Sequence, residues 1–287
     1  MSSLAWVETI EDVRSHVRKA RQAGLTIGLV PTMGALHDGH VQLIKQCREE
    51  NGFVVVSLFV NPTQFGPLED FTRYPRTPED DQARAAVGGA DLIFAPSAET
   101  MYPRGGLSTA VEVSALTDRF EGAIRPGHFR GVATVVLKLF SIVQPDTAYF
   151  GQKDFQQLSV IRRMVEDLNL LVGIRPVATV REPDGLAMSS RNRYLDEAQR
   201  RGAVVLWRAL ENARRAVRAG EQDAERVRQI LRETIKSEGM AQLEYAEVVD
   251  PDTLLDLTHI EDGRRAIGLL AVRFGSTRLI DNAYLAE

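Results

Sequence analysis

The chain has 287 residues, of which 44% are hydrophobic and 26% are charged, as is ordinary for a globular protein of one large or two moderate domains. Its net charge is −4, without the basic bias of a nucleic-acid-binding protein. No apolar stretch approaches the length of a membrane span, and the N-terminus lacks the basic start and apolar core of a secretory signal. We therefore expect a cytoplasmic protein with no nucleic-acid or membrane partner.

The first part of the chain alternates between predicted helices and predicted strands. Apolar residues at helical spacing predict helices, and near-continuous apolar runs that end in turns predict strands of a parallel sheet. We expect helices over residues 8–23, 40–50, from 78 onward, 132–143 and 155–168, and strands over 26–30, 53–60, 91–95, 147–150 and 173–180. Residues 101–106 and 125–131 are expected to be loops. This alternation predicts an α/β fold with a Rossmann-like, doubly wound parallel sheet.

The pattern changes after Pro183-Asp184-Gly185, which is a turn signal. Two predicted helices (203–217 and 224–236) and three predicted strands (243–249, 266–272 and 277–280) follow it. Helices followed by strands are typical of a small α+β domain. We therefore predict a Rossmann-like domain over residues 1–184 and a smaller C-terminal α+β domain over residues 185–287.

The most informative stretch covers residues 29–40, where glycines at 34 and 39 flank His37 and His40. An apolar run stops at Pro31, and apolar residues recur at helical spacing beyond His40, so we predict a strand, a turn and a helix that begins at the histidine pair. A helix N-terminus offers unpaired N–H groups and a partial positive charge, which suit a phosphate. Two imidazole donors beside it could hold a polyphosphate whose charge grows during reaction. His-x-Gly-His is thus a candidate signature of nucleotidyl transfer.

Two other interpretations of the histidine pair remain open on the residues alone. The pair could ligate zinc, although Cys47 is the only cysteine and no His-Glu-x-x-His pattern is present. It could also be a partly buried pair with only a structural role. Cys47 itself lies on the apolar face of the predicted helix, where we expect a packed core thiol.

Three further polar clusters follow strand ends or the domain boundary. Gln64 can hydrogen-bond an uncharged part of a substrate as both donor and acceptor. Lys153, with Asp154 and Gln157 close by in sequence, is a point charge suited to phosphate. Residues 188–191 add two hydroxyls and a guanidinium that could clamp a triphosphate. Taken singly, Gln64 and Lys153 are more typical of solvated surface residues, and Ser189 of a helix cap.

With these clusters, the chain resembles the pantothenate synthetase (pantoate–β-alanine ligase) family of the His-x-Gly-His nucleotidylyltransferase superfamily. Seven stretches carry the resemblance over nearly the whole length: residues 31–40, 60–65, 74–77, 125–131, 151–157, 188–192 and 278–282. One departure is Gln152, where the family commonly has Glu, and backbone contacts would survive that change. Met188 stands where other members carry a different apolar residue.

The resemblance implies a two-step reaction. ATP and pantoate form pantoyl adenylate and release pyrophosphate, and the amine of β-alanine then attacks the acyl carbon to displace AMP. ATP with Mg²⁺ is the implied cofactor set, the Mg²⁺ being held mainly through phosphate oxygens. Asp80 or Asp81 could assist it through water. No metal site built by protein ligands is expected, and the family suggests a homodimer.

The resemblance also assigns residues. The implied ATP site comprises Met33, Gly34, His37, Gly39, His40, Gly151, Gln152, Lys153, Asp154, Val180, Met188, Ser189, Ser190 and Arg191. Within it, the implied catalytic residues are His37, His40, Lys153 and Arg191, with His40 as the proton donor. Gln64 and Gln157 would hold pantoate, Gln64 would also touch β-alanine, and the C-terminal domain would act as a lid.

Three questions stay open at this point. Arg125 and His128 belong either to a loop that covers the site or to an ordinary surface loop. The chain could be another adenylylating or cytidylylating enzyme of the same superfamily. It could also be a nucleotide-binding regulatory protein without turnover, which the intact set of polar residues disfavours.

Overall fold

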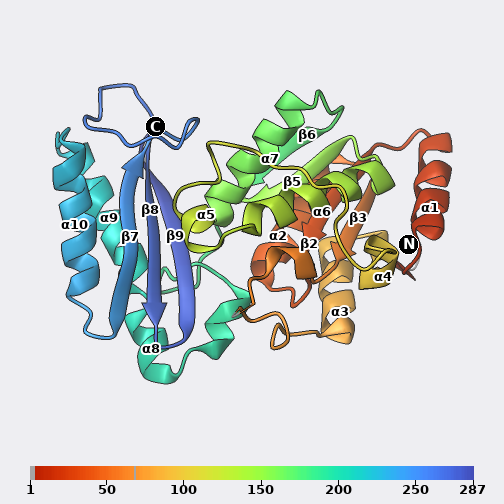
Figure 1. The fold of residues 1–287 in the computed structure, drawn as a ribbon, viewed down its shortest axis with the longest axis horizontal. Coiled ribbons are helices and arrows are strands. Elements are labelled where there is room, and N and C mark those ends of the chain that lie inside the picture. The colour runs from red at the N-terminus through yellow and green to blue at the C-terminus, as the bar shows by residue number, and fades with distance from the viewer. Residues whose placement is uncertain (1–3, 68) are drawn as a thin grey trace. The chain divides into compact units, whose positions relative to one another are not determined.

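The computed structural model describes residues 4–67 and 69–287 (Figure 1). Contacts between Cα atoms divide the chain into two compact units. The first unit comprises the chain up to Gly151 together with Gln156–Ala178, and the second comprises Gln152–Phe155 together with Thr179–Glu287. The predicted boundary between residues 184 and 185 stays a prediction. The segment Gln152–Phe155, which contains the predicted ATP-binding residues Gln152, Lys153 and Asp154, thus groups with the C-terminal part of the chain.

The first unit is built on a six-stranded sheet in which every pair of neighbouring strands is parallel. Its strands are β1 (Ala5–Val7), β2 (Ile27–Thr32), β3 (Phe53–Leu58), β4 (Leu92–Phe94), β5 (Thr147–Gly151) and β6 (Gly173–Val177). The order is β1-β4-β3-β2-β5-β6, so the chain moves from β2 to one side and later returns to the other. This order confirms the predicted doubly wound sheet and places its switch point between β2 and β5.

Most of these strands follow from their apolar runs. Residues 54–56 of β3 are fully buried, as a strand covered on both faces requires. The prediction that β2 stops at Pro31 is wrong, because the strand continues to Thr32 and Pro31 pairs with Ser57 near the strand end. Strand β1 was not predicted, since three residues with no repeating pattern give little signal.

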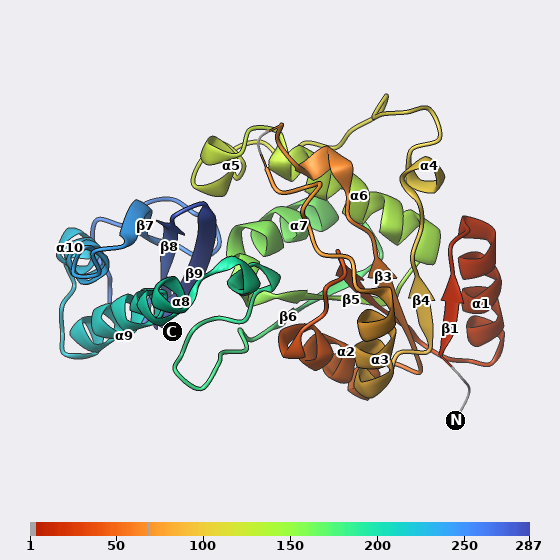
Figure 2. The ribbon, with the colours of Figure 1, turned by 90° about the horizontal axis from the view of Figure 1, so that it is seen from below.

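Helices flank both faces of this sheet. They are α1 (Ile10–Gln22), α2 (Asp38–Glu50), α3 (Pro78–Gly88), α4 (Ala98–Met101), α5 (Glu121–Ile124), α6 (His128–Val143) and α7 (Phe155–Asp167). Figure 2 shows α2 and α3 on one face and α6 and α7 on the other. In the part of the chain that the structure describes, no helix combines the length and the apolar character that a membrane crossing requires.

Helix α6 begins at His128, four residues before the predicted start, so the prediction of a loop over residues 125–131 is partly wrong. The glycine that suggested a loop has a packing role. A Cβ on Gly131 would lie 2.3 Å from the backbone oxygen of Thr63, so only glycine permits this close approach. The helix therefore packs directly against the short 3-10 helix η1 (Pro62–Gln64).

The second unit is an α+β domain, as predicted. Its antiparallel sheet has the order β7-β8-β9, with β7 (Ala241–Val249), β8 (Ala266–Phe274) and β9 (Thr277–Ala286). Its helices are α8 (Glu197–Gly202), α9 (Val205–Arg218) and α10 (Ala224–Lys236), and two 3-10 helices, η2 (Gln152–Asp154) and η3 (Ser190–Tyr194), complete it. The fully buried residues Leu210, Leu231 and Leu270 join α9, α10 and β8 in one apolar core.

Candidate active site

The carboxyl ends of three adjacent strands of the first unit carry the predicted site residues. The histidine turn follows β2, Gln64 follows β3, and Gly151 closes β5. These strands lie side by side in the order β3-β2-β5, and their parallel direction brings their carboxyl ends to one edge. In open α/β sheets, ligands bind outside that edge at the switch point. The sheet thus gathers these residues where a nucleotide is expected.

The two histidines form the N-terminal cap of α2. His37 is the N-cap residue, and its Nδ1 accepts from the Gly39 N–H at 3.2 Å. His40 reaches back so that its Nδ1 accepts from the His37 N–H at 3.3 Å, which completes a capping box. The ring centroids are 4.1 Å apart. Because both Nδ1 atoms accept, each neutral imidazole carries its proton on Nε2 and can donate from there.

The turn before these histidines has an unusual backbone that a buried carboxylate holds. Gly34 and Ala35 have φ values of +81° and +50°, and the latter is strained for a residue with a side chain. Asp81, only 3% exposed, accepts from the N–H groups of Ala35 at 3.0 Å and Leu36 at 2.7 Å. Each of its two oxygens therefore accepts a hydrogen bond from the turn, and the hypothesis that Asp80 or Asp81 assists Mg²⁺ through water stays a prediction. Asp80, one residue earlier, is exposed.

Gln64 is 7% exposed, so the surface interpretation of this residue is wrong. Its Oε1 accepts from Asn61 Nδ2 at 3.0 Å, and its Nε2 lies 3.1 Å from the Met33 sulfur. Asn61 in turn accepts at Oδ1 from the Tyr102 hydroxyl at 2.7 Å. The structure thus brings Met33 and Gln64 together, and it adds two residues that the sequence interpretation missed. Asn61 carried the same signal as Gln64, since it directly follows the strand predicted over residues 53–60, whereas Tyr102 carried none.

Arg125 and His128 support the backbone of Gln64, so the interpretation as an ordinary surface loop is wrong, and a role of this loop in covering the site stays a prediction. His128 Nδ1 contacts the Gln64 carbonyl oxygen at 2.8 Å, and its Nε2 lies 3.0 Å from Arg125 Nη1. Arginine can only donate, so His128 is neutral and donates from Nδ1. Glu69 accepts two hydrogen bonds from Arg125, at 2.6 and 2.7 Å. Burial, aided by the neighbouring Arg125 charge, lowers the pKa of His128 to about 4.

The remaining predicted ATP residues lie in the second unit, apart from Gly151. Lys153 lies in the 3-10 helix η2, and its side chain is 19% exposed. Its Nζ lies 3.8 Å from Asp154 Oδ1 in the same element. Val180 and Met188 are paired, because the Met188 N–H donates to the Val180 carbonyl at 3.0 Å.

The Ser189–Arg191 segment forms the start of η3. Ser189 is its N-cap, and its hydroxyl accepts from the Arg191 N–H at 3.3 Å. The interpretation of Ser189 as a helix cap is therefore confirmed, while Ser190 and Arg191 occupy the first turn. Gln157, by contrast, stands in the first unit, half-buried on the first turn of α7.

No group of three or more His, Cys, Asp or Glu side chains among residues 4–67 and 69–287 is arranged to hold a metal ion. The Nδ1 atoms of both histidines accept hydrogen bonds from backbone N–H groups, so these two nitrogens act as helix-capping acceptors. Cys47 is fully buried on α2, and burial raises the pKa of its thiol to about 12. The prediction of a packed core thiol is confirmed.

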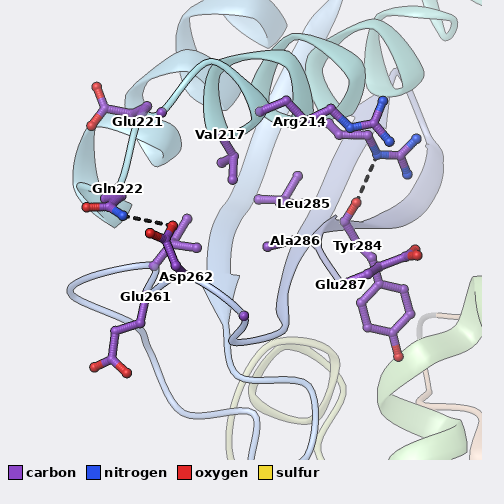
Figure 3. Close-up of a pocket in the computed structure, with 14 residues that line it drawn as sticks. Arg214, Val217, Glu221, Gln222, Glu261, Asp262, Tyr284, Leu285, Ala286 and Glu287 are labelled. Carbon is purple, nitrogen blue, oxygen red and sulfur yellow. Dashed lines mark hydrogen bonds between the residues drawn. The ribbon is translucent and has the colours of Figure 1, made fainter.

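A separate cavity of about 380 Å³ opens in the second unit beside the end of α9 (Figure 3). No predicted site residue lines it. Two hydrogen bonds join residues of its lining, from Arg214 Nε to the Tyr284 carbonyl (2.9 Å) and from Gln222 to Asp262 (3.1 Å). Four acidic side chains, those of Glu221, Glu261, Asp262 and Glu287, line it as well. This lining disfavours a polyphosphate there.

In a doubly wound sheet, nucleotides and other ligands bind at the switch point, and this chain places the histidine-capped N-terminus of α2 there. Residues 5–284 match the family described as pantoate-beta-alanine ligase. Pantothenate synthetase of Pelotomaculum thermopropionicum is 54% identical over 279 residues, which cover 97% of this chain and 98% of that protein. The chain therefore belongs to the pantoate–β-alanine ligase family.

Two solved structures agree with this assignment. Pantothenate synthetase from Thermus thermophilus has a TM-score of 0.93 and 47% identity, covering 99% of this chain and 100% of that one. Pantoate-beta-alanine ligase from Francisella tularensis, complexed with beta-gamma ATP and beta-alanine, has a TM-score of 0.78 and 34% identity, covering 98% of both chains. The predicted family and the predicted fold class are confirmed.

Proposed function

We propose that this chain is an ATP-dependent, AMP-forming ligase that condenses (R)-pantoate with β-alanine to give pantothenate. The observation that carries this proposal is the family match over residues 5–284, nearly the whole chain. The pantoate-beta-alanine ligase from Francisella tularensis, which was solved complexed with beta-gamma ATP and beta-alanine and which matches 98% of this chain, supports the use of ATP and β-alanine. We further propose that the protein is cytoplasmic and acts as a homodimer.

The proposed reaction has two steps. A carboxylate oxygen of pantoate attacks the α-phosphorus of ATP, and pyrophosphate leaves. The amine of β-alanine then attacks the acyl carbon of pantoyl adenylate, and AMP leaves with the bridging oxygen while the amine loses a proton. Adenylation is needed because AMP is a far better leaving group than hydroxide. The protein supplies no covalent nucleophile in this scheme, so positioning and charge stabilisation do the catalytic work.

The first-unit residues would bind the reacting ends of both substrates. Met33, Gly34, His37, Gly39 and His40 would receive the ATP phosphates at the N-terminus of α2, where N–H groups and the helix dipole favour an anion. His40 would donate a proton or hydrogen bond from Nε2 as negative charge develops. Gln64 and Gln157 would hold pantoate, with Gln64 also touching β-alanine. The support for Gln64 is its fixed, buried amide.

The remaining ATP contacts would come from Gly151 and from the second unit. Lys153 and Arg191 would neutralise phosphate charge, and Gln152, Asp154, Val180, Met188, Ser189 and Ser190 would complete the contacts. Mg²⁺ would accompany ATP through the phosphate oxygens and lower the charge that the side chains face. The domain over residues 185–287 would act as the lid.

Pyrophosphate exchange tests the proposal. Labelled pyrophosphate should enter ATP when pantoate is present and β-alanine is absent, because the first step is reversible and needs no amine. Exchange that requires a different acid would point to another adenylylating enzyme of the superfamily. ATP binding without exchange for any acid would support the regulatory alternative, and either result would refute the proposal.

A further inference from the structure

The side chain of Asn282 on β9 holds the turn that carries Lys153. Its Nδ2 donates to two consecutive backbone carbonyls, those of Gln152 at 2.9 Å and Lys153 at 2.8 Å. The residue is only 7% exposed. Both protons of the amide are therefore engaged across a separation of about 130 residues in the sequence. Residues 278–282 belong to a stretch that carries the family resemblance, yet they have no role in the binding site as proposed.

A buried ion pair fixes Asn282 in turn. The carboxylate of Asp281, which is 3% exposed, accepts from the Asn282 N–H at 2.8 Å. Arg181 binds the same carboxylate through two nitrogens, at 2.6 and 3.0 Å, and also donates to the Asn282 carbonyl at 3.2 Å. A bidentate pair of this kind sets the geometry as well as the charge. The backbone and the orientation of Asn282 are thus determined on both sides.

The same arginine also fixes the segment that leads to Ser189–Arg191. Its guanidinium lies 3.8 Å from the centre of the Trp207 ring and donates to the Gly185 carbonyl at 3.1 Å. Gly185 has a φ of +98°, and a Cβ there would lie 1.9 Å from Trp207, so only glycine fits. An antiparallel β-bridge joins Arg181 to Ala187, so the two residues close the turn that contains Gly185. All of these residues belong to the second unit.

We propose that Asn282 is a positioning residue for Lys153, and that the Arg181–Asp281 pair links it to the segment bearing Arg191. One buried network would then set the backbone from which both proposed phosphate-binding cations extend. This inference rests on the proposed function, which assigns Lys153 and Arg191 to the triphosphate. Aspartate at position 282 would have the same shape but no donors, and it would turn a carboxylate toward two carbonyl oxygens.

The variant Asn282→Asp tests this role. We expect kcat/KM for ATP in the exchange reaction to fall roughly ten- to hundredfold, since two buried hydrogen bonds are lost. Asn282→Ala, which introduces no charge, should show a fall in the same direction. The matched control is Asn212→Asp, because Asn212 also donates through its amide in the second unit, to Thr234 at 3.2 Å on α10. The control should retain wild-type kinetics.

A double-mutant cycle separates positioning from general structural damage. If Asn282 acts through Lys153, adding Asn282→Ala to Lys153→Met should lower kcat/KM for ATP no further than Lys153→Met alone. A further fall by the full factor of the single variant would overturn the proposal, as would wild-type kinetics in both Asn282 variants.

ATP affinity, measured by calorimetry without pantoate, keeps the two proposals distinguishable. If the wild-type protein binds ATP but shows no exchange with pantoate, the proposed function fails, while weaker ATP binding by Asn282→Ala would still support the positioning role. Unchanged ATP binding by that variant would overturn the positioning role whatever the exchange assay shows.

Discussion

The variant Asp81→Asn should loosen the histidine turn. Asp81 accepts from two consecutive N–H groups, those of Ala35 and Leu36, and it lies in a buried site. An asparagine oxygen can accept from one of them, while its NH₂ group faces the other and leaves that donor unsatisfied. A buried unsatisfied donor costs about 1–3 kcal/mol of unfolding free energy. If the substitution lowers the unfolding free energy by about 2 kcal/mol, the Tm of the first unit should fall by roughly 4–8 °C.

The assay is thermal unfolding together with the pantoate-dependent exchange rate. Asp80→Asn is the matched control, because Asp80 lies beside Asp81 on α3 but is exposed. It should change stability by no more than about 0.5 kcal/mol. Exchange by Asp81→Asn should fall at temperatures where the protein is still folded, since His37 and His40 directly follow the loosened turn. Equal Tm values and equal exchange rates for the two variants would refute the role of Asp81.

Two other perturbations test the histidines. We expect His40→Ala to lower the exchange rate far more than ATP affinity, compared by exchange kinetics and calorimetry, and an equal loss in both would mean that His40 only binds. His128 has a folded pKa of about 4, below the value of about 6.5 expected when unfolded, so the unfolded chain takes up the proton first as pH falls. Stability should therefore decline from pH 6.5 to pH 4 by up to about 3 kcal/mol, and His128→Gln should show a shallower decline in denaturant titrations. If the stability of the wild-type protein and of His128→Gln declined equally with falling pH, His128 would not be the cause of the decline.

Much of the fold was predictable because its signals are local. The apolar run of β3 and the apolar face of α10 each determine one element without reference to distant residues. The prediction failed where tertiary contacts decide. Strand β1 exists because it pairs with β4, and the first turn of α6 contains a glycine because η1 packs against it. A single sequence does not reveal such partners.

The candidate site divides in the same way. The histidine cap at the start of α2 was predictable, since the glycines, the histidines and the helical pattern lie within one short stretch. The residues that hold the site's backbone in place, Asp81 and Asn282, were not predictable. Asp81 lies 45 residues from Leu36, and Asn282 lies 129 residues from Lys153. Neither residue type in its own sequence context predicts a partner at that distance, so these roles emerge only from the folded chain.

Oxygen-18 transfer is the most direct test of the central claim that pantoate is activated as an adenylate. With both carboxylate oxygens of pantoate labelled, one label should appear in AMP during complete turnover with ATP and β-alanine, because AMP leaves with the bridging oxygen. Mass spectrometry of the AMP measures this transfer. Label found in inorganic phosphate, with ADP as the nucleotide product, would contradict the account, because it would mean that activation occurs through an acyl phosphate.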